Sequence, residues 1–490
     1  MNNSPSIARV VTALAVLAGA AAAVHYAQLG LTLSHYDARG HLMVARRVVD
    51  SLTPGWQQLG AVWLPLPHLL NLLPAQWDWS YRTGFSGAVL SILPLSIGLG
   101  AFAGYLARRT SSWAIGVATP LVILLNPNVL YLQSTPMTEP LLFGLALLAV
   151  VALDRWLAEP DTARTWIAGG VLAALVLTRY EGWAVAGALL AVAAAAAPGR
   201  TARLILFPAI AVAAFVLLSW GATGSWFVTS GFFEANNPAL GLPGLALDQV
   251  IEGAARLGGE WLLWLGLAGA IVGLISALGC VRRDRTGAAR ALLPLALAAS
   301  AALPLYAFTS GHPVRIRYMI SLVVAASALS AFALARLPRR LRTPAAAAFL
   351  AAALWTAPPV DGQAPMVREA QWERPYSDAR RQVTAALVER WDGTPIMASM
   401  GSLGHYMQQM SAQGFALKDF LHEGNGDIWK AALITPRPFV KWILIEESAE
   451  GGDQLAMLAR ANPSFLEGFA RVTESGGVAL YARTGPGSPR

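Results

Sequence analysis

Residues 83–106 read TGFSGAVLSILPLSIGLGAFAGYL and contain no charged side chain, while Arg82 precedes them and Arg108 and Arg109 follow. An apolar run of about 20 residues can cross the hydrocarbon core of a bilayer as a helix. Comparable runs recur along the first three quarters of the chain, so the chain is predicted to be a polytopic α-helical membrane protein. We expect about eleven spans of this length, at residues 7–29, 83–106, 112–131, 138–155, 165–179, 182–198, 203–222, 260–280, 288–308, 316–335 and 343–357.

The composition of the whole chain agrees with this class. Of the 490 residues, 55% are hydrophobic and 13% are charged, and the mean hydropathy is +0.49. A typical soluble domain has about 25% charged residues. The single cysteine, Cys280, rules out a disulfide framework or a thiolate metal cluster within the chain. The formal net charge of +8 comes from arginines in short connections between apolar runs, where they orient helices rather than bind nucleic acid.

The arginines also predict the sidedness of the protein. They concentrate in alternate connections, as in Arg108-Arg109, Arg282-Arg283 and Arg339-Arg340. The positive-inside bias places such connections, and with them the N-terminus, in the cytoplasm. An odd number of spans then leaves the C-terminal part on the extracytoplasmic side.

Two domains are expected, a transmembrane part at 1–357 and a soluble part at 358–490, joined by a linker that begins with Pro358-Pro359. The first outer loop, 30–82, contains an amphipathic stretch, Ala38–Leu52, expected to form a helix in the membrane interface. A second long outer loop covers about 223–259. In the soluble part, helices and strands alternate, which favours a small α/β domain. We expect helices at 377–391, after Gly401 and at 453–462, and strands at 395–399, 440–446 and 478–482.

The first outer loop opens with Tyr36-Asp37-Ala38-Arg39-Gly40-His41. A carboxylate just beyond the first span could act as a general base on an incoming hydroxyl. If a helix begins here, Asp37 and His41 share one of its faces. The alternative is structural, because an aspartate that precedes a helix commonly caps it.

Later in the same loop, Trp63-Leu64-Pro65-Leu66-Pro67-His68 forms an extended turn that positions Trp63 and His68 as substrate contacts. An aromatic anchor at the membrane interface is the alternative for this segment. Glu139 opens a later span, either as a second acid that faces Asp37 or as a carboxylate that favours the helix dipole.

Arg179-Tyr180-Glu181 places two charges within an otherwise apolar hairpin. Charges at membrane depth are usually paired and functional, so an Arg179–Glu181 or an Arg179–Asp37 pair is expected.

The segment His312-Pro313-Val314-Arg315-Ile316-Arg317-Tyr318 begins another span from the outer side, against the positive-inside bias. Arginine forks bind phosphate oxygens in a bidentate manner, so a lipid phosphate is a natural partner for Arg315 and Arg317. Snorkelling toward lipid headgroups is the alternative.

No Walker loop, dinucleotide glycine fingerprint, HExxH or DxD-type cluster appears in the sequence. The sequence therefore disfavours ATP-driven transport and chemistry on soluble nucleotide sugars. No cofactor is expected, and single acids at each site make a divalent metal possible but not expected.

Taken together, the chain resembles GT-C-fold glycosyltransferases of the protein O-mannosyltransferase and aminoarabinose-transferase superfamily, over about residues 1–330. The resemblance rests on four features: Asp37 after the first span, the Pro65-Leu66-Pro67 turn, the Glu139-Pro140 pair and the Arg317-Tyr318 pair.

The resemblance implies an inverting enzyme of the bacterial inner membrane that transfers a sugar from a polyprenyl phosphate to an acceptor hydroxyl on a glycan, lipid or protein. Asp37 would be the general base, with Glu139 as a second catalytic acid. Arg179, Arg315, Arg317 and Tyr318 would bind the lipid phosphate. Substrate contacts would come from Tyr36, His41, Trp63, His68, Tyr180, Glu181 and His312. In the soluble domain, His405, Tyr406, His422 and Trp429 are candidate sugar contacts.

A transporter or flippase of a lipid-linked sugar would share the phosphate site but would need no base. Polar groups near the midplane of broken helices are typical of transporters. Here the spans are apolar in their middles, which favours an enzyme. A membrane-anchored binding module would leave the outer acids and arginines unexplained.

Overall fold

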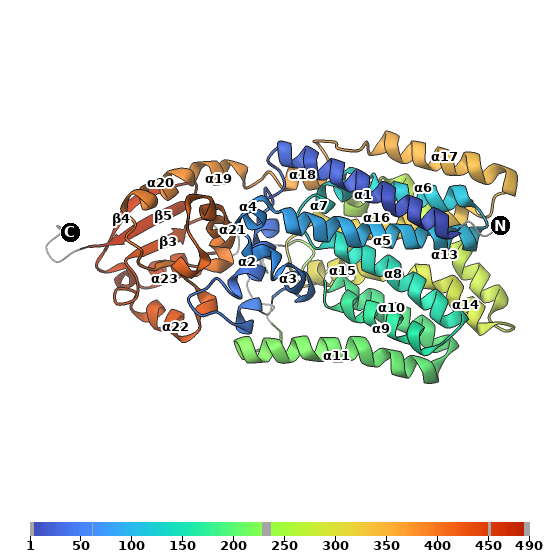
Figure 1. Cartoon of the computed structure of the whole chain (residues 1–490), viewed down its shortest axis with the longest axis horizontal. Coiled ribbons are helices and arrows are strands. Elements are labelled where there is room, and N and C mark those ends of the chain that lie inside the picture. Colours follow the sequence, from blue (N-terminus) through green and yellow to red (C-terminus); the bar gives the residue numbers. More distant parts are fainter. Residues whose placement is uncertain (1–3, 61, 228–236, 449–451, 485–490) are drawn as a thin grey trace.

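The computed structural model describes residues 4–60, 62–227, 237–448 and 452–484. A bundle of helices forms one end of the molecule and a small sheet with its covering helices forms the other (Figure 1). The helices of the first outer loop lie between them. The N-terminal end of α1 lies at the far end of the bundle from the sheet, so the first span runs toward the soluble domain (Figure 1).

Seven helical segments of the described chain are long and apolar enough to cross a membrane, which confirms the polytopic helical class. They are α1 (Ser4–Gln28), α5 (Phe85–Thr110), α8 (Glu139–Ala158), α11 (Pro198–Thr223), α13 (Glu260–Cys280), the run Arg285–Thr309 made of α14 (Arg285–Leu292), η3 (Leu293–Ala301) and α15 (Ala302–Thr309), and the run Ile316–Leu334 made of η4 (Ile316–Met319) and α16 (Ile320–Leu334). The remaining predicted spans are also helical. They are the shorter α9 (Thr162–Val176) and α10 (Glu181–Ala196), the arginine-rich α17 (Arg339–Thr356) and a broken pair.

The broken pair differs from the straight span expected at 112–131. Helix α6 (Trp113–Leu124) and helix α7 (Pro127–Gln133) meet at an angle of 68°. The Asn126 side chain accepts hydrogen bonds from the backbone N–H groups of Asn128 (3.0 Å) and Val129 (3.4 Å), and so caps α7 as a new helix. Pro127 follows as the first residue of α7, where its missing N–H costs nothing.

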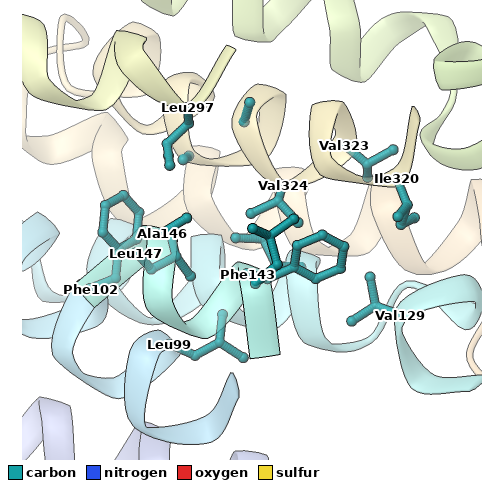
Figure 2. Packing of buried hydrophobic residues seen from close by; sticks show 14 of the residues in the cluster. Leu99, Phe102, Val129, Phe143, Ala146, Leu147, Leu297, Ile320, Val323 and Val324 are labelled. Atoms are coloured by element: carbon teal, nitrogen blue, oxygen red, sulfur yellow. The ribbon is translucent and has the colours of Figure 1, made fainter. Parts of the chain in front are cut away.

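The bundle core forms where α5, α8 and α16 meet. Leu99 and Phe102 of α5 lie against Phe143 and Leu147 of α8, with Val324 of α16 above them (Figure 2). Glycines allow α5 and α8 to cross at backbone contact, because a Cβ added at Gly98 would lie 2.5 Å from the carbonyl oxygen of Gly144. Small residues at crossings are the usual means of close helix packing in membranes.

The first outer loop contains α2 (Tyr36–Arg47), η1 (Trp56–Leu59), α3 (Leu66–Asn71), η2 (Pro74–Gln76) and α4 (Asp78–Thr83). We expected the amphipathic stretch to lie along the membrane surface. Instead α2 is buried inside the protein, and Met43 and Val44 belong to the core of the soluble domain. The amphipathic pattern reflects two protein partners, the bundle on one side and the soluble domain on the other.

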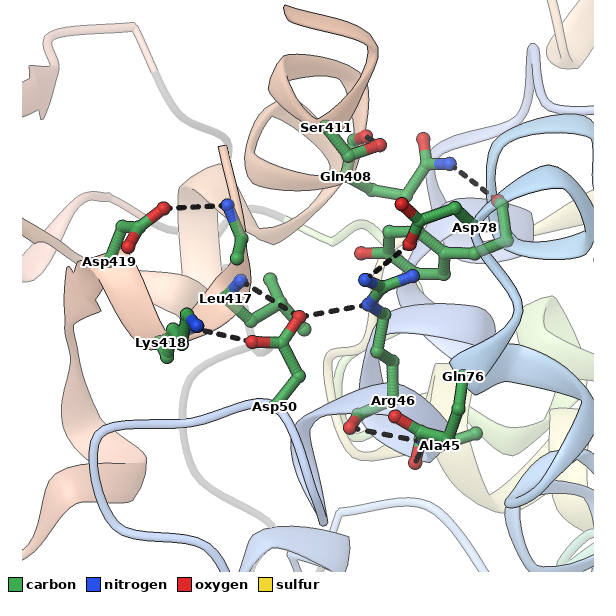
Figure 3. Close-up of polar contacts among 12 residues, drawn as sticks. Ala45, Arg46, Asp50, Gln76, Asp78, Gln408, Ser411, Leu417, Lys418 and Asp419 are labelled. Atoms are coloured by element: carbon green, nitrogen blue, oxygen red, sulfur yellow. Dashed lines mark hydrogen bonds and ion pairs between the residues drawn. The ribbon is translucent and has the colours of Figure 1, made fainter. Parts of the chain in front are cut away.

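Polar contacts fasten this loop to the soluble domain (Figure 3). Arg46 forms ion pairs with Asp50 (2.9 Å) and Asp78 (2.6 Å). The Asp50 carboxylate also accepts hydrogen bonds from the backbone N–H groups of Leu417 (3.2 Å) and Lys418 (3.0 Å). The end of α2 is therefore tied to both the outer loop and the soluble domain.

In the second long outer loop, residues 228–236 lie outside the described residues, and α12 (Pro243–Gly258) precedes α13.

The soluble domain contains a five-stranded sheet of order β2-β1-β3-β5-β4, with β2, β1 and β3 parallel and β5 and β4 antiparallel to their neighbours. The expected α/β class is confirmed, although β2, β4 and α22 were not foreseen. The strands are β1 (Ile396–Ala398), β2 (Phe420–Leu421), β3 (Trp442–Glu446), β4 (Phe469–Ser475) and β5 (Val478–Arg483). The helices are α18 (Pro365–Glu369), α19 (Arg374–Ala379), α20 (Arg381–Arg390), α21 (Met400–Met410), α22 (Asp427–Ile434) and α23 (Gln454–Ala461), with short turns η5 (Ser411–Gln413), η6 (Leu417–Asp419), η7 (Glu423–Asn425) and η8 (Pro463–Leu466).

Candidate active site

A cavity of about 260 Å³ lies between the first outer loop and the ends of the spans that face the soluble domain. Segments far apart in the sequence line it, and most of the candidate residues from the sequence are among them. These are Tyr36, Asp37, His41, Trp63, Arg179, Tyr180, Glu181, His312, Arg315, Arg317 and Tyr318. The two remaining candidates from the transmembrane part, Glu139 and His68, are not among the lining residues, but each contacts one of them.

Asp37 stands in the first turn of α2, and its side chain is not the helix cap. The cap is His35, whose Nδ1 accepts a hydrogen bond from the backbone N–H of Asp37 (3.1 Å). The Asp37 carboxylate instead forms an ion pair with the Arg317 guanidinium, and both side chains are at most 9% exposed. The helix-capping alternative for Asp37 therefore does not apply, and Asp37 is among the residues that line the cavity.

Two opposing effects act on the Asp37 carboxyl. Burial raises its pKa, but the charge and hydrogen bond of Arg317, together with His35 and His41, outweigh burial and lower the pKa from its ordinary value to about 2. Asp37 is thus ionised at any physiological pH as long as Arg317 is its partner.

Arg179 is engaged by two carboxylates. Its guanidinium forms ion pairs with Glu139 (3.0 Å) and Glu181 (2.8 Å) and donates a hydrogen bond to the hydroxyl of Thr138 (3.0 Å). The expected Arg179–Glu181 pair is present, whereas Asp37 has a different partner. Glu139 is 1% exposed and is not among the residues that line the cavity. From its position in the first turn of α8 it reaches Arg179.

The charged residues that line the cavity are two carboxylates, Asp37 and Glu181, and three arginines, Arg179, Arg315 and Arg317. Glu139, which is not among them, contributes a third carboxylate through its ion pair with Arg179. Two ion pairs, Asp37–Arg317 and Arg179–Glu181, have both members in the lining of the cavity.

Trp63 and two histidines form one wall. The His41 ring lies 4.2 Å from the Trp63 ring, measured between centroids, and His41 Nδ1 lies 3.0 Å from His68 Nε2. Burial lowers the pKa of His41 to about 3, so the ring is neutral. The indole lies so close to α2 that a Cβ added at Gly40 would be 2.8 Å from Trp63 Cη2.

Another part of the lining is aromatic and cationic. The Arg317 guanidinium lies 6.0 Å from the Tyr36 ring and 5.6 Å from the Tyr318 ring, within the range of cation–π attraction. The His312 and Tyr318 rings are 5.5 Å apart. Tyr180 donates its hydroxyl proton to the carbonyl oxygen of Val62 (3.2 Å) and so joins the hairpin to the outer loop.

Sequence reasoning missed the apolar side of the cavity, which Leu303, Tyr306 and Ala307 of α15 contribute. Nothing in the sequence distinguishes them from lipid-facing residues of a span.

Sequence reasoning also missed Glu369 of α18, whose carboxylate lies 3.4 Å from Nε2 of His35, the residue that caps α2. The linker to the soluble domain therefore supports the helix that presents Asp37.

The candidate sugar contacts of the soluble domain do not reach this cavity. Tyr406 and His422 are fully buried in that domain, and Trp429 is 4% exposed within its core. His405 Nε2 lies 2.6 Å from Arg380 Nη1. Their placement is that of core residues. Within the described ranges, no three His, Cys, Asp or Glu side chains are close enough together to bind a metal ion.

Comparison with solved structures identifies the class of architecture as the GT-C fold, as the sequence resemblance implied. ArnT from Cupriavidus metallidurans bound to undecaprenyl phosphate matches with a TM-score of 0.59 at 14% identity, over 96% of this chain and 99% of ArnT. The apo state of ArnT gives a TM-score of 0.56 at 14% identity, over 95% and 98% of the two chains. The oligosaccharyltransferase of Archaeoglobus fulgidus in its apo form matches at 0.52 and 12% identity, over 97% of this chain and 74% of that protein.

No protein-family model matches the sequence, and no curated protein matches it. At these identities the structural matches show the fold.

Proposed function

We propose that this protein is an inverting glycosyltransferase that moves a hexosyl or pentosyl group from a polyprenyl phosphate to an acceptor hydroxyl. The observation that carries the proposal is the Asp37–Arg317 pair at the cavity, which offers a carboxylate base and a phosphate-binding guanidinium side by side. The same fold binds undecaprenyl phosphate in ArnT, which supports a lipid-linked donor here.

The donor phosphate would bind the Arg317 guanidinium in competition with the Asp37 carboxylate. Guanidinium groups bind phosphate oxygens through two parallel hydrogen bonds, so a phosphate competes well with a single carboxylate. Once Arg317 is shared with the phosphate, the Asp37 carboxylate loses the charge that lowers its pKa, and burial raises the pKa. Donor binding would thus make Asp37 a stronger base at the moment a base is needed.

The transfer step then proceeds in line. The acceptor oxygen attacks the anomeric carbon as Asp37 takes the hydroxyl proton, and the bond from that carbon to the phosphate oxygen breaks. Polyprenyl phosphate leaves with the electron pair, and Arg317 and Arg315 stabilise its charge. This scheme uses no organic cofactor, and the arginines take the part that a metal ion would otherwise play.

The other lining residues have supporting roles in the proposal. Glu139 and Glu181 fix Arg179, which in turn orders the hairpin around Tyr180. Tyr36, His41, Trp63, Tyr180 and His312 contact the sugar or the acceptor, His68 supports His41, and Tyr318 stacks near the phosphate. The apolar residues of α15 receive the first isoprene units of the carrier.

The site lies at the end of the bundle that faces the soluble domain (Figure 1). With the sidedness that the arginines predict, this is the extracytoplasmic face of a bacterial inner membrane. A glycan, a lipid or a protein would supply the acceptor hydroxyl from that side.

A reconstituted assay tests the function against the flippase alternative. Proteoliposomes would contain a synthetic undecaprenyl-phosphate sugar, with candidate acceptors outside, and mass spectrometry would follow the free carrier. A transferase releases undecaprenyl phosphate together with a glycosylated acceptor. Movement of intact donor between leaflets, without release of free carrier by any acceptor tried, would favour the flippase. Mass spectrometry of glycans and lipids from a deletion strain would name the sugar and acceptor.

A further inference from the structure

A second cavity, of about 550 Å³, lies between the loop that follows α1 and helices α19, α20 and α21 of the soluble domain. Polar residues and one glycine line it: Gly30, Ser34, Arg39, Arg374, Ser377, Asp378, Arg381 and Gln409. None of these residues lines the catalytic cavity. Arg39 and Asp37 are two positions apart on α2, which places their side chains on different faces of the helix.

Arg39 is a partly buried cation that forms no ion pair with a carboxylate among the described residues, although the charge of Glu373 acts on it. Its Nε donates a hydrogen bond to the carbonyl oxygen of Leu33 (2.6 Å), and its Nη1 donates to Oε1 of Gln409 (3.1 Å). Gln409 is itself fixed by a hydrogen bond from its Nε2 to the carbonyl oxygen of Ser377 (3.0 Å). The guanidinium is thus oriented by neutral acceptors only, and its charge is not neutralised by these contacts.

The cavity as a whole is positive. Arg39, Arg374 and Arg381 contribute three positive charges, and Asp378 alone contributes a negative one, which leaves two in excess. The Arg381–Asp378 ion pair (2.7 Å) is exposed, so an incoming anion can compete for Arg381 at small cost. A partly buried arginine that is hydrogen-bonded only to neutral groups is costly to keep in a protein, and an anion that joins it lowers this cost.

We propose that this cavity is a second phosphate-binding site, separate from the catalytic cavity, that takes the phosphate of an anionic lipid headgroup. Three arginines around one cavity provide the forks that recognise phosphate oxygens. Gly30 and Ser34 lie shortly after the end of α1 at Gln28, and α1 is long and apolar enough to cross a membrane. We therefore expect this cavity near the level of the headgroup phosphates.

Native mass spectrometry of the full-length protein can test the proposal. The protein would be released from nanodiscs of phosphatidylcholine with or without phosphatidylglycerol, and the bound phosphatidylglycerol would be counted. We expect an Arg39→Gln/Arg374→Gln variant to lose at least tenfold in affinity for phosphatidylglycerol. Arg374→Gln/Arg381→Gln, which alters exposed side chains only, should show the same loss without a change in melting temperature.

Two controls separate this site from others. Arg390 is an exposed arginine on α20, the helix that carries Arg381, but Arg390 does not line the cavity. Arg390→Gln should therefore bind phosphatidylglycerol as the wild type does. Arg317→Gln alters the catalytic cavity and should leave this binding unchanged.

A parallel titration with inorganic phosphate identifies the source of the phosphate. One outcome is that inorganic phosphate binding depends on the three arginines while phosphatidylglycerol binding does not. That result would support a phosphate site but contradict a lipid headgroup as its ligand. Binding of both probes that is equal in the wild type and both double variants would overturn the proposal.

Discussion

The Asp37 carboxylate and the Arg317 guanidinium, which stand at opposite ends of the transmembrane sequence, form a buried ion pair on the wall of one cavity. Asp37 comes from the first helix of the outer loop, and Arg317 precedes α16. Their pairing neutralises both charges while the site is empty. It also means that whatever binds Arg317 changes the chemistry of Asp37.

Replacement of Arg317 by glutamine should weaken binding of undecaprenyl phosphate by about ten- to a hundredfold, since a charge-assisted hydrogen bond contributes roughly 1.5–3 kcal/mol. Arg317→Lys keeps the charge but lacks the planar fork, so its affinity for undecaprenyl phosphate should lie between those of the wild type and Arg317→Gln. Equilibrium binding of the carrier in detergent or nanodiscs measures this. Unchanged affinity in Arg317→Gln would remove Arg317 from the phosphate site.

The pH dependence of kcat/KM should also change in Arg317→Gln. In the wild type, burial raises the pKa of Asp37, but Arg317, with smaller contributions from His35 and His41, lowers it to about 2, so the free enzyme should show no acid limb from Asp37 between pH 4 and 8. Without Arg317, the largest effect that lowers the pKa is lost, and the pKa rises. Asp37 must be ionised to act as a base, so activity is lost as the pH falls through its pKa. In Arg317→Gln this acid limb of the residual activity should lie at a higher pH than in the wild type. Superimposable profiles would contradict this assignment.

Gly40→Ala should disturb the site through Trp63. The new Cβ would lie 2.8 Å from Trp63 Cη2, so the indole must move or α2 must shift, at a cost of about 1–3 kcal/mol for overpacking. We expect a lower melting temperature and a changed tryptophan fluorescence. Gly170→Ala is the matched control, because nothing lies within 4 Å of its added Cβ and alanine favours a helix. Equal behaviour of the two variants would show that the Trp63 contact is unimportant.

Asp50→Ala should loosen the soluble domain from the outer loop. It leaves the backbone N–H groups of Leu417 and Lys418 without their acceptor and removes one partner of Arg46 (Figure 3), at a cost of about 1–3 kcal/mol. Faster limited proteolysis near the linker, relative to the wild type, is the expected result. Asp427→Ala breaks an exposed pair with Lys430 and should have no such effect. Proteolysis at the wild-type rate in Asp50→Ala would show that these bonds do not dock the domain.

Acid should destabilise the soluble domain through His422. Burial lowers the pKa of His422 from its ordinary value of 6.5 to about 3, so the ring remains neutral in the folded domain while the unfolded chain takes up a proton. Its contribution to stability is complete above pH 6.5 and is lost as the pH falls toward 3, at about 1.4 kcal/mol per pH unit. Melting temperatures from pH 7.5 to 5 should fall less steeply in His422→Asn than in the wild type. Parallel curves would contradict this role of His422.

Much of this organisation could be predicted because charges are rare in the spans. The few acids and arginines near the outer ends of apolar runs stand out in the sequence, and the structure brings Asp37, Arg179 and Arg317 to one place. Which acid meets which arginine could not be predicted, because that depends on how the spans cross. Glu139 pairs with Arg179, whereas Asp37 pairs with Arg317.

Other features depend on contacts that have no local sequence signal. An amphipathic helix such as α2 looks the same whether its apolar face meets lipid or a second domain. Strand β2 has two residues, Phe420 and Leu421, and forms only because β1 offers it a parallel edge. The apolar side of the cavity, on α15, resembles any other part of a span.

Asp37→Asn, assayed for both carrier binding and sugar transfer, tests the proposed mechanism most directly. The amide keeps the shape of the side chain but cannot take a proton, so transfer should fall by about a hundred- to ten-thousandfold. Binding of undecaprenyl phosphate should be unchanged or tighter, because Arg317 no longer has a competing carboxylate. Transfer by Asp37→Asn at the wild-type rate would contradict the assignment of Asp37 as the general base.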